Sequence, residues 1–284
     1  MISAFERMVA FRYLRARKAE GFVSVIATFS FLGIMLGVAT LIIVMSVMNG
    51  FRQELIGRIL GLNGHITVYA QSGPLSDYNT LSLRLTDIEG VTSVNPFIEG
   101  QALLSHNGAA RGVLVRGLKP EDFSKKPILG DKILVGDKED FKDTGVAIGV
   151  ELAEKLQLTV GDQITLIAPK GRASPFGTIP RTRSYTVAAI FDTGMFEYNS
   201  GFVFMPLEAA QMFFQLPQAV TGIEVMTADP SHLDDVKTAI KTATEGTANV
   251  TDWRDMNGSF FNALQVERNV MFMILTLIIL VAAF

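Results

Sequence analysis

The sequence predicts an α+β protein: an N-terminal transmembrane helix, a mixed α/β domain on helical stalks, and the start of a second transmembrane helix. Val23–Asn49 contains no charged residue and no histidine, the middle alternates strand patterns with short amphipathic helices, and Asn269–Phe284 is again uncharged. The expected bounds are 1–21 for a basic cytoplasmic or interfacial helix, 22–49 for the first span, 50–268 for the domain with its stalks, and 269–284 for the second span.

The stretch Val23–Asn49 is long enough to cross a membrane. At about 1.5 Å per residue it forms a helix of about 40 Å, and the hydrocarbon core of a bilayer is about 30 Å thick. A cleaved signal peptide is the alternative, but the apolar region is too long for one and no A-x-A-like site stands before Gly50. We therefore expect a true transmembrane helix.

Basic residues predict the orientation of this span. The basic residues before it are Arg7, Arg12, Arg15, Arg17 and Lys18. Only Glu6 and Glu20 oppose them, and Arg52 and Arg58 follow the span. Because cationic flanks stay in the cytoplasm, the N-terminus is expected inside and the middle domain is expected to be translocated. Apolar residues at near-helical spacing within residues 4–18 favour an interfacial helix over a solvated basic tail.

Small residues within the span indicate a helix contact. Gly33 and Gly37 form a G-x-x-x-G, and Ser46 and Gly50 repeat the small-xxx-small spacing. Such pairs let a second helix approach closely, although glycine is common in membrane helices without that role. Beyond the span, Phe51–Leu62 keeps a helical stripe of apolar residues, which predicts that the helix continues as a stalk.

The translocated region, of about 220 residues, is long enough for one large domain or two small ones. Asn107-Gly108 between two alternating runs predicts a hairpin, Pro206 is expected at a first helical turn, and Ser231 is expected to cap a helix. The predicted strands are His65–Ala70, Ala102–Ser105, Gly112–Gly117, a strand after Gly161-Asp162, Ser184–Phe191, Ser200–Met205 and Gly222–Thr227. The predicted helices are Leu81–Glu89, Gly149–Leu156, Leu207–Leu216 and His232–Ala243.

A second stalk helix is predicted from Trp253 to Glu267, leading into the uncharged run Asn269–Phe284. At about 1.5 Å per residue that run covers about 24 Å, which is short of a full bilayer. We therefore expect the chain to be the front part of a longer membrane protein.

No catalytic or metal-binding pattern stands out. His65, His106 and His232 are scattered without metal-ligand spacing, and no G-x-S-x-G, Walker loop or H-E-x-x-H occurs. The acidic run Asp137–Asp143 mixes signs and lacks an EF-hand pattern, which favours a solvated loop. The chain has no cysteine, which excludes disulfides, thiol chemistry and cysteine-based metal sites. We predict no catalytic residue and no metal site.

Residues 168–183 are chemically unusual. The prolines there are Pro169, Pro175 and Pro180, and the cations are Lys170, Arg172, Arg181 and Arg183. Because proline restricts the backbone and removes donors, the stretch cannot be a central strand, and the strands on both sides predict a protruding hairpin loop. Phe176 and Ile179 near its tip, above a basic base, suit a docking loop for a partly acidic partner. A flexible basic loop without a partner is an equally weighted alternative.

The motifs RYLRAR (Arg12–Arg17), GFVS (Gly21–Ser24) and SVMNGF (Ser46–Phe51) mark the opening of the chain. They closely resemble the start of the lipoprotein-releasing ABC permeases of the LolC/LolE family. The LA-x-x-L-x-L-x-x-GD-x-I pattern (Leu152–Ile164) is similar to the extracytoplasmic domain of the wider MacB-like class. The stretch SPFGTIPRTRSYTV (Ser174–Val187) looks more like LolC than LolE. The resemblance spans essentially the whole chain.

The resemblance implies a MacB-like periplasmic domain between the first and second of four membrane helices. It also implies two permeases assembled with two copies of a cytoplasmic ATPase, LolD, in the bacterial inner membrane. ATP bound by that partner would drive outer-membrane lipoproteins onto the periplasmic chaperone LolA, so this chain would be neither an enzyme nor a cofactor carrier. Homodimer and heterodimer both stay open.

The resemblance also assigns roles to the unusual stretch. The hook that docks the chaperone would comprise Pro169, Pro175, Phe176, Gly177, Ile179 and Pro180. Arg181 and Arg183 would form a basic pad beneath it. Lipoprotein extraction requires an apolar groove as well, and Met45, Met48 and Phe51 are candidates because flexible methionines suit varied acyl shapes. Ordinary lipid-facing or helix-packing residues are the alternative for all three.

Other functions share this topology. A MacB-like efflux permease would work with a membrane fusion protein and would not need the proline-rich basic loop. An FtsX-like signalling subunit would activate a cell-wall hydrolase without transporting anything. A bitopic receptor is a further alternative, against which the incomplete second span argues. The partner bound outside the membrane discriminates among them.

Overall fold

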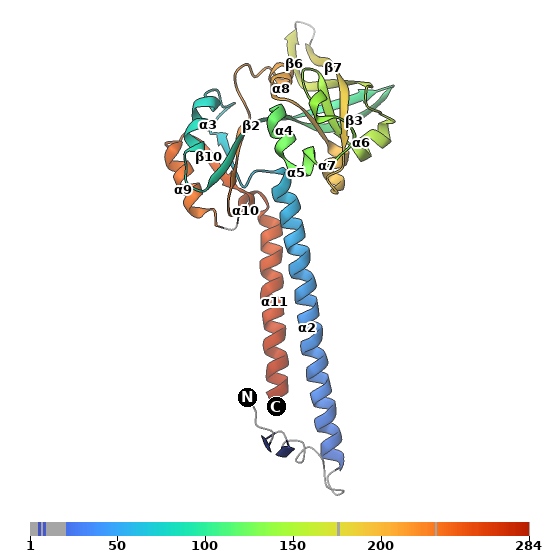
Figure 1. Cartoon of the computed structure of the whole chain (residues 1–284), viewed down its shortest axis with the longest axis vertical. Helices are drawn as coiled ribbons and strands as arrows, with labels where there is room; N and C mark the ends of the chain where they lie inside the picture. The colour runs from blue at the N-terminus through green and yellow to red at the C-terminus, as the bar shows by residue number, and fades with distance from the viewer. Residues whose placement is uncertain (1–4, 7, 10–20, 175–176, 231, 284) are drawn as a thin grey trace. The chain divides into compact units, whose positions relative to one another are not determined.

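The computed structural model describes residues 5–6, 8–9, 21–174, 177–230 and 232–283. The chain divides into a helical unit, Met1–Leu55 with Asn257–Phe284, and a domain unit, Ile56–Met256. Figure 1 shows the helices and strands of both. The α+β class predicted from the sequence is confirmed, whereas the interfacial helix expected over 4–18 lies largely outside the described residues.

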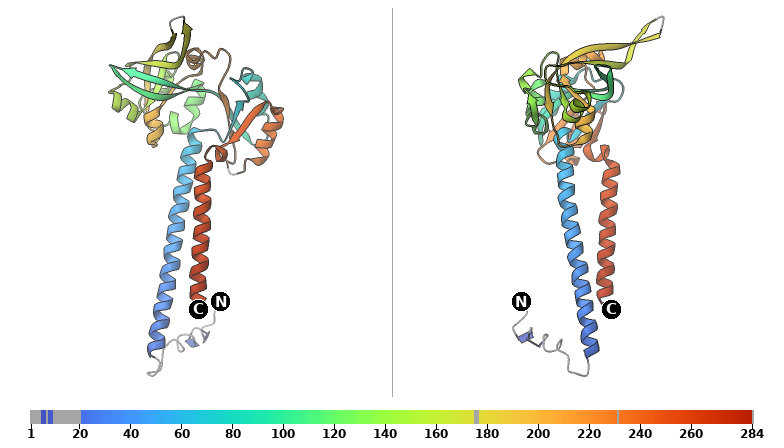
Figure 2. Two further views of the ribbon diagram at one scale, coloured as in Figure 1. Left: turned by 180° about the vertical axis from the view of Figure 1, so that it is seen from behind. Right: turned by 90° about the vertical axis from the view of Figure 1, so that its right-hand side faces the viewer.

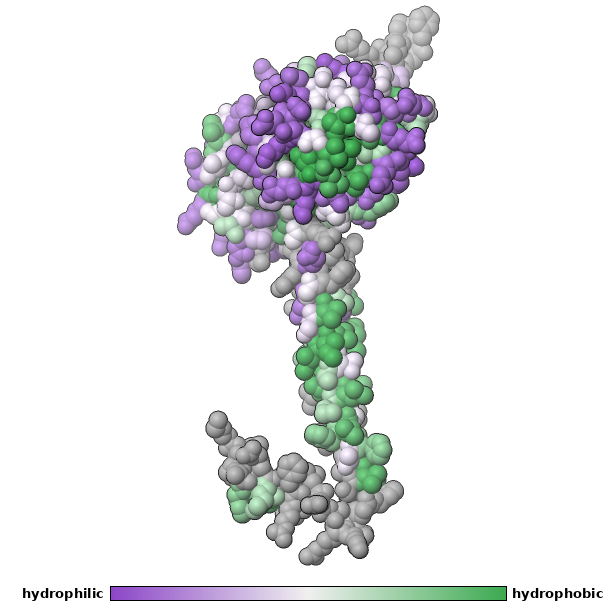
Figure 3. Space-filling view, turned by 45° about the vertical axis from the view of Figure 1, so that its right-hand side comes forward, coloured by the Kyte–Doolittle hydropathy of each residue, from purple (hydrophilic) through white to green (hydrophobic). Residues whose placement is uncertain are grey.

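Two long helices run side by side in the helical unit (Figures 1 and 2), α2 (Gly21–Leu62), whose residues from Ile56 onward belong to the domain unit, and α11 (Gly258–Ala283). Among the described residues, one helix is long and apolar enough to cross a membrane, over Thr28–Gly50, and Asn269–Ile278 is a shorter apolar segment. Figure 3 shows hydrophobic residues gathered along the helices, and on the visible face of the domain unit it shows a hydrophobic patch surrounded by hydrophilic residues. The predicted continuation of the first helix through Phe51–Leu62 is confirmed.

The domain unit is built on ten strands. They are β1 (Ile66–Ala70), β2 (Val91–His106), β3 (Ala109–Leu118), β4 (Ile133–Gly136), β5 (Gly145–Gly149), β6 (Gln163–Ser174), β7 (Gly177–Phe191), β8 (Phe202–Pro206), β9 (Gly222–Thr227) and β10 (Ala248–Asp252). The long strand β2 takes part in two sections of the sheet, which we call the two sheet layers. Its residues Val91–Phe97 pair with β9, and its residues Ile98–His106 pair with β3.

One of these two sheet layers is an open sheet, and the other closes on itself. On one side of β2 the order is β10–β1–β9–β2, with every pair antiparallel. On the other side the pairs run from β2 through β3, β8, β5, β7 and β6 back to β2, so these strands close into a barrel. Closure removes free sheet edges, and β4 adds to the barrel by pairing with β7.

The β2–β3 turn confirms the hairpin predicted at Asn107-Gly108. Both residues have positive φ, 48° at Asn107 and 82° at Gly108. A two-residue turn of this hand matches the twist of antiparallel strands, and asparagine followed by glycine adopts it at low cost. The turn fixes the register in which Leu103 lies opposite Gly112.

Short helices cover the sheets. They are α3 (Tyr78–Thr86), α4 (Pro120–Lys125), α5 (Pro127–Gly130), α6 (Val150–Leu156), α7 (Phe196–Gly201), α8 (Leu207–Phe214), α9 (Asp234–Ala243) and α10 (Trp253–Met256), with a 3-10 turn at Lys138–Asp140. The helix predicted after Pro206 is confirmed as α8, which packs against β2 and β3. Gly117 allows this packing, since a side chain there would overlap Ala210.

An apolar cluster fills the centre of the domain unit. The stacked rings of Phe123 and Phe141 lie 4.0 Å apart, and Phe191 meets Phe204 edge-on at 5.3 Å. Aromatic pairs in these arrangements stabilise a fold by more than the burial of their apolar area alone. Leu62, the last residue of α2, belongs to the same cluster, so the end of the helix is part of the domain core.

Three sequence expectations need correction. The helix predicted from His232 begins at Asp234, because Leu233 before it is fully buried and Asp234 and Asp235 occupy the first turn, where carboxylates suit the helix dipole. The helix predicted at Leu81–Glu89 begins earlier, at Tyr78. The second stalk is interrupted at Asn257, since α10 is a separate turn capped by Asp252. Ser231, the predicted cap, lies outside the described residues.

Candidate functional site

The β6/β7 hairpin is the segment that the sequence marks as a docking loop. From Ala168 and Arg181 outward, the two strands pair with each other and with no other described strand, and they project as a ribbon (Figure 2). Pairing continues to Ser174 opposite Gly177, so most of the expected loop is paired strand. Proline is tolerated there because a two-stranded ribbon is not the middle of a sheet.

The prolines of the predicted hook lie where the hairpin ladder is irregular. The register shifts between Ala168 and Arg172, beside Pro169, and both Pro169 and Pro180 are exposed. A residue without an N–H group is confined to such bulges and edges. Pro175 and Phe176 lie outside the described residues, while the backbones of Gly177 and Ile179 belong to β7. Their docking role stays a prediction.

The two arginines of the predicted basic pad have different surroundings. Arg181 is half-buried, and its Nη1 donates to the carbonyl of Phe213 near the C-terminal end of α8. A cation at that end satisfies a carbonyl that the helix leaves unpaired and complements the helix dipole. Arg183 is exposed. The geometry therefore gives Arg181 a structural bond and leaves Arg183 the more accessible of the two.

A hollow of about 600 Å³ opens at the root of the hairpin. Its lining residues are Gln101, Ala102, Leu103, Gly112, Val113, Leu114, Ile167, Ala168, Pro169 and Pro180. Leu103 lies opposite both Gly112 and Ile167 in the strand register and is 40% exposed, so this lining is largely apolar yet open. The sequence gives no sign of this hollow, because the hollow requires the pairing of β6 with β2.

In the helical unit, α2 and α11 line a second hollow of about 470 Å³, which includes Gly33 and Gly37. A Cβ at Gly37 would lie 3.8 Å from Ile278 of α11, whereas one at Gly33 would meet nothing within 4 Å. Met45, a candidate for the lipoprotein groove, is 41% exposed, and Met48 is half-buried. The side chain of the third candidate, Phe51, is outside the described part of the chain.

Among the described charged residues of the domain unit, Glu224 on β9 is the most deeply buried, at 0% exposed. Its Oε1 accepts from Arg116 Nη2 at 2.5 Å and from the Gly64 N–H at 3.1 Å, and its Oε2 accepts from Lys126 Nζ at 2.7 Å. Burial raises the pKa of Glu224, but Arg116 and Lys126 lower it more, so the net shift is downward. We call Glu224, Arg116 and Lys126 the Glu224 centre.

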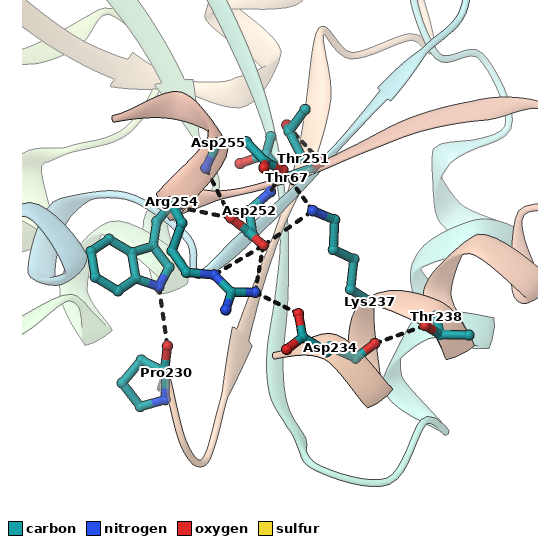
Figure 4. Close-up of polar contacts among 10 residues, drawn as sticks. Thr67, Pro230, Asp234, Lys237, Thr238, Thr251, Asp252, Arg254 and Asp255 are labelled. Atoms are coloured by element: carbon teal, nitrogen blue, oxygen red, sulfur yellow. Dashed lines mark hydrogen bonds and ion pairs between the residues drawn. The ribbon is translucent and has the colours of Figure 1, made fainter. Parts of the chain in front are cut away.

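A second charged network surrounds Asp252, where β10 meets α10 (Figure 4). Asp252 Oδ2 accepts from Lys237 Nζ at 3.1 Å and from Arg254 Nη2 at 2.8 Å. Its Oδ1 accepts the N–H groups of Arg254 and Asp255, as a helix cap does. Burial raises the pKa of Asp252, but these hydrogen bonds and Lys237 outweigh burial and lower it to about 2.

The entry and exit of the domain unit lie directly beside each other. Ile66 of β1 pairs with Asp252 of β10, and the Trp253 N–H donates to the His65 carbonyl at 3.1 Å. The His65 ring is buried, and its Nδ1 accepts the Thr227 N–H at 3.0 Å. Burial lowers the pKa of His65. The two charged networks therefore hold the two ends of the domain unit.

Neither network was predicted from the sequence. The signal that could have found Glu224 is a lone carboxylate inside the apolar strand GIEVMT, since such a group is rarely buried without partners. In the described part of the chain, no group of three or more His, Asp or Glu residues could hold a metal ion. The β6/β7 hairpin and the hollow at its root present exposed apolar and basic groups, such as Leu103 and Arg183.

Comparison with known proteins places the chain among membrane transport components. The family model described as MacB-like periplasmic core domain matches residues 27–243. The lipoprotein-releasing system transmembrane protein LolC of Neisseria meningitidis is 37% identical over 99% of this chain and 68% of its own length. LolC of Xylella fastidiosa (strain Temecula1) is 33% identical over 100% of this chain and 69% of its own. LolE of Haemophilus influenzae is 28% identical over 97% of this chain and 68% of its own.

A solved structure, the periplasmic region of MacB from Actinobacillus actinomycetemcomitans, aligns with 72% of this chain and 96% of its own. The sequence identity is 13% and the TM-score is 0.47. The kinship of the chain therefore rests on the sequence matches.

Proposed function

The chain belongs to the LolC family of lipoprotein-releasing permeases, and from this premise we propose that it passes outer-membrane lipoproteins to a soluble periplasmic carrier. It works as the permease subunit of an ABC transporter in the inner membrane. A separate LolD-like subunit hydrolyses ATP, and a second LolC- or LolE-type permease completes the membrane part. The carrier is LolA-like.

The observation that carries this proposal is the likeness to LolC along nearly the whole chain, which covers the apolar helix as well as the domain unit. A match confined to the domain would support only a MacB-like extracytoplasmic module, which other transporters share. The extended match supports the lipoprotein-releasing function over efflux or signalling.

Energetics explain why such a permease needs a partner ATPase and a carrier. Each CH₂ group of a membrane-buried acyl chain contributes about 0.8 kcal/mol to the free energy of membrane binding. Extracting a lipoprotein with two or three such chains therefore costs on the order of tens of kcal/mol. The periplasm contains no ATP, so the energy for extraction has to arrive from the cytoplasmic side. A soluble carrier must then shelter the chains, and the permease must hold that carrier in place during transfer.

The β6/β7 hairpin and the hollow at its root are the proposed docking surface. Exposed Arg183 attracts an acidic carrier surface, and exposed Leu103 with its apolar neighbours offers area to bury. Arg181 contributes indirectly by fixing the end of α8 beneath the hairpin. The hook residues are Pro169, Pro175, Phe176, Gly177, Ile179 and Pro180.

The acyl chains start their path in the membrane, and the proposal places Met45, Met48 and Phe51 along it. Met45 is the most accessible of the described pair, at 41% exposed, and an unbranched flexible side chain adapts to chains of different shape. Gly33 and Gly37 keep their proposed role in helix packing.

A photo-crosslinking residue at Phe176 of the full-length protein in cells tests the docking surface. We expect an adduct with a small soluble lipoprotein carrier, identified by mass spectrometry. The same probe at Leu83, 71% exposed on α3, is the matched control and should give none. Arg183→Glu should abolish the adduct while the protein stays folded. An adduct with a membrane fusion protein, or with a regulator of a cell-wall hydrolase, would contradict the proposal.

A further inference from the structure

The end of α2 is tied to the domain unit by the Glu224 centre. Lys126, between α4 and α5, donates from its ammonium to the Leu62 carbonyl at 2.7 Å as well as to Glu224. Glu224 in turn accepts the Gly64 N–H at 3.1 Å. One ammonium and one carboxylate therefore hold two backbone groups at the end of the helix, where such groups otherwise lack partners.

The same centre joins elements of both sheet layers. Glu224 lies on β9, which pairs with β1 and β2, and Arg116 lies on β3, which pairs with β2 and β8 in the barrel. Arg116 Nη1 also donates to Asn63 Oδ1 at 2.9 Å, and the Asn63 amide donates to the Tyr198 hydroxyl at 2.9 Å. Asn63 is thus bonded to β3 and α7, and Gly64 is bonded to β9.

Stability alone does not explain this arrangement. A buried ion pair loses solvation on folding, and its replacement by apolar side chains of similar volume is often neutral or stabilising. Leu62 already anchors the helix end in the apolar cluster. What the charges add is defined geometry. Glu224 of β9 holds the Gly64 N–H, Arg116 of β3 holds the Asn63 side chain, and Lys126 between α4 and α5 holds the Leu62 carbonyl.

We propose that the Glu224 centre is a mechanical coupling, through which a displacement of α2 is passed to the barrel that carries the β6/β7 hairpin. α2 is one helix from the apolar span Thr28–Gly50 to Leu62, and its residues from Ile56 onward belong to the domain unit. Arg116, Lys126 and Glu224 are positioning residues in this scheme. The inference rests on the proposed function, because the coupling is proposed to act during lipoprotein release.

A reversible covalent tie can replace the charged one. A Cβ built at Gly61 lies 3.6 Å from the Ile128 Cβ, within the separation of about 3.5–4.5 Å that disulfides span. The chain has no cysteine of its own, so Gly61→Cys with Ile128→Cys can form only the intended bond within it. This disulfide would join the last turn of α2 to α5, next to Lys126.

The uncoupled variant carries Arg116→Met, Lys126→Met and Glu224→Leu, so that the buried carboxylate and both buried cations leave together; Glu99, 32% exposed, loses only its 3.7 Å pair with Arg116. It is assembled into the complete transporter, and ATP-dependent release of a lipoprotein to the carrier is measured. We expect the variant to fold, as judged by Trp253 emission, and to lose release. Adding the disulfide should restore release, and dithiothreitol should remove it again. The disulfide in the unaltered background is the matched control and should release in both redox states.

Release by the uncoupled variant at the unaltered rate would overturn the proposal, and so would a formed disulfide that fails to restore release. If the triple variant does not fold, Lys126→Met with Glu224→Gln and the same disulfide replaces it, judged by the same two outcomes; one buried cation and the carboxylate then leave together, and Arg116 keeps its bond to Asn63. Hydrogen exchange at the Gly64 amide gives a readout that is independent of transport. In the uncoupled variant this amide should exchange about 100-fold faster than in the unaltered protein, because its bond to Glu224 is gone. An unchanged exchange rate would refute the coupling. No release by the unaltered transporter would count against the proposed function alone.

Discussion

Asp252→Asn tests whether the network at the exit of the domain unit contributes stability through charge. Asparagine has nearly the shape of aspartate, and its carbonyl oxygen can still accept the N–H groups of Arg254 and Asp255, which Asp252 Oδ1 accepts at 2.9 and 3.0 Å. What it loses is the negative charge that faces Lys237 and Arg254 on the Oδ2 side. The substitution therefore separates the ionic contribution from the capping contribution.

The pKa of Asp252 sets the expected magnitude. It falls from an ordinary value of 3.8 to about 2 in the folded protein, and each pKa unit corresponds to about 1.4 kcal/mol. The ionised carboxylate therefore contributes about 2 kcal/mol to the free energy of unfolding at neutral pH. Because the folded pKa is depressed, this contribution is fully present above pH 3.8 and is lost as the pH falls through about 2.

Urea unfolding of the full chain in detergent, followed by Trp253 emission, measures this difference. Trp253 is the only tryptophan and is 5% exposed. It follows the substituted residue directly, and its Nε1 donates to the Pro230 carbonyl at 3.1 Å. Asp234→Asn is the matched control, because Asp234 pairs with the same Arg254 but its side chain is 83% exposed, so its loss should cost under about 1 kcal/mol.

We expect Asp252→Asn to lower the free energy of unfolding by about 2 kcal/mol at pH 7, and the gap to the unaltered protein to narrow steadily below pH 4. A loss of equal size at pH 7 and at pH 3 would show that shape, not charge, is responsible. An equal loss from Asp234→Asn would show that exposure does not screen these ion pairs, and either result would refute the reasoning.

Two further substitutions test the packing and the buried histidine. Gly149→Ala should cost about 1–3 kcal/mol in urea unfolding, because a Cβ there would overlap the backbone of Asn199, whereas Gly112→Ala, with nothing within 4 Å, should change little. Burial lowers the pKa of His65, so stability should decline as the pH falls below about 6.5, and His65→Gln should flatten that decline in unfolding measured from pH 7 to 5. Equal losses at both glycines, or an unchanged pH slope, would contradict these expectations.

Local signals in the sequence predicted local structure well. The uncharged run gave the membrane helix and its continuation, Asn107-Gly108 gave a turn with two positive φ values, and Pro206 gave the start of α8. The fully buried strand Gly145–Gly149 was missed, because a strand buried on both faces has no polar alternation to mark it. Closure of the barrel was missed for a related reason: the pairing of β6 with β2 joins strands that carry no mutual signal.

The candidate site shows the same division between local and distant interactions. The composition of residues 168–183 marked the hairpin, yet the role of Arg181 could not be read from it, since the carbonyl that it binds lies 32 residues away. The partners of Glu224 lie 98 and 108 residues from it. A lone carboxylate in an apolar strand indicates that partners exist, but only the fold identifies them.

The two charged networks differ in a way that bears on how the domain unit is held. At the entry, the side chains of Glu224, Lys126 and Arg116 are at most 8% exposed, so salt and solvent screen their interactions little. At the exit, Lys237 and Arg254 are partly exposed, and their bonds to Asp252 are weakened accordingly. Ile66, close to the entry, pairs with Asp252 at the exit, so the two networks lie at adjacent ends of β1 and β10. Within the domain unit, the charges at the entry are therefore the more deeply buried, and those at the exit are the more exposed to solvent.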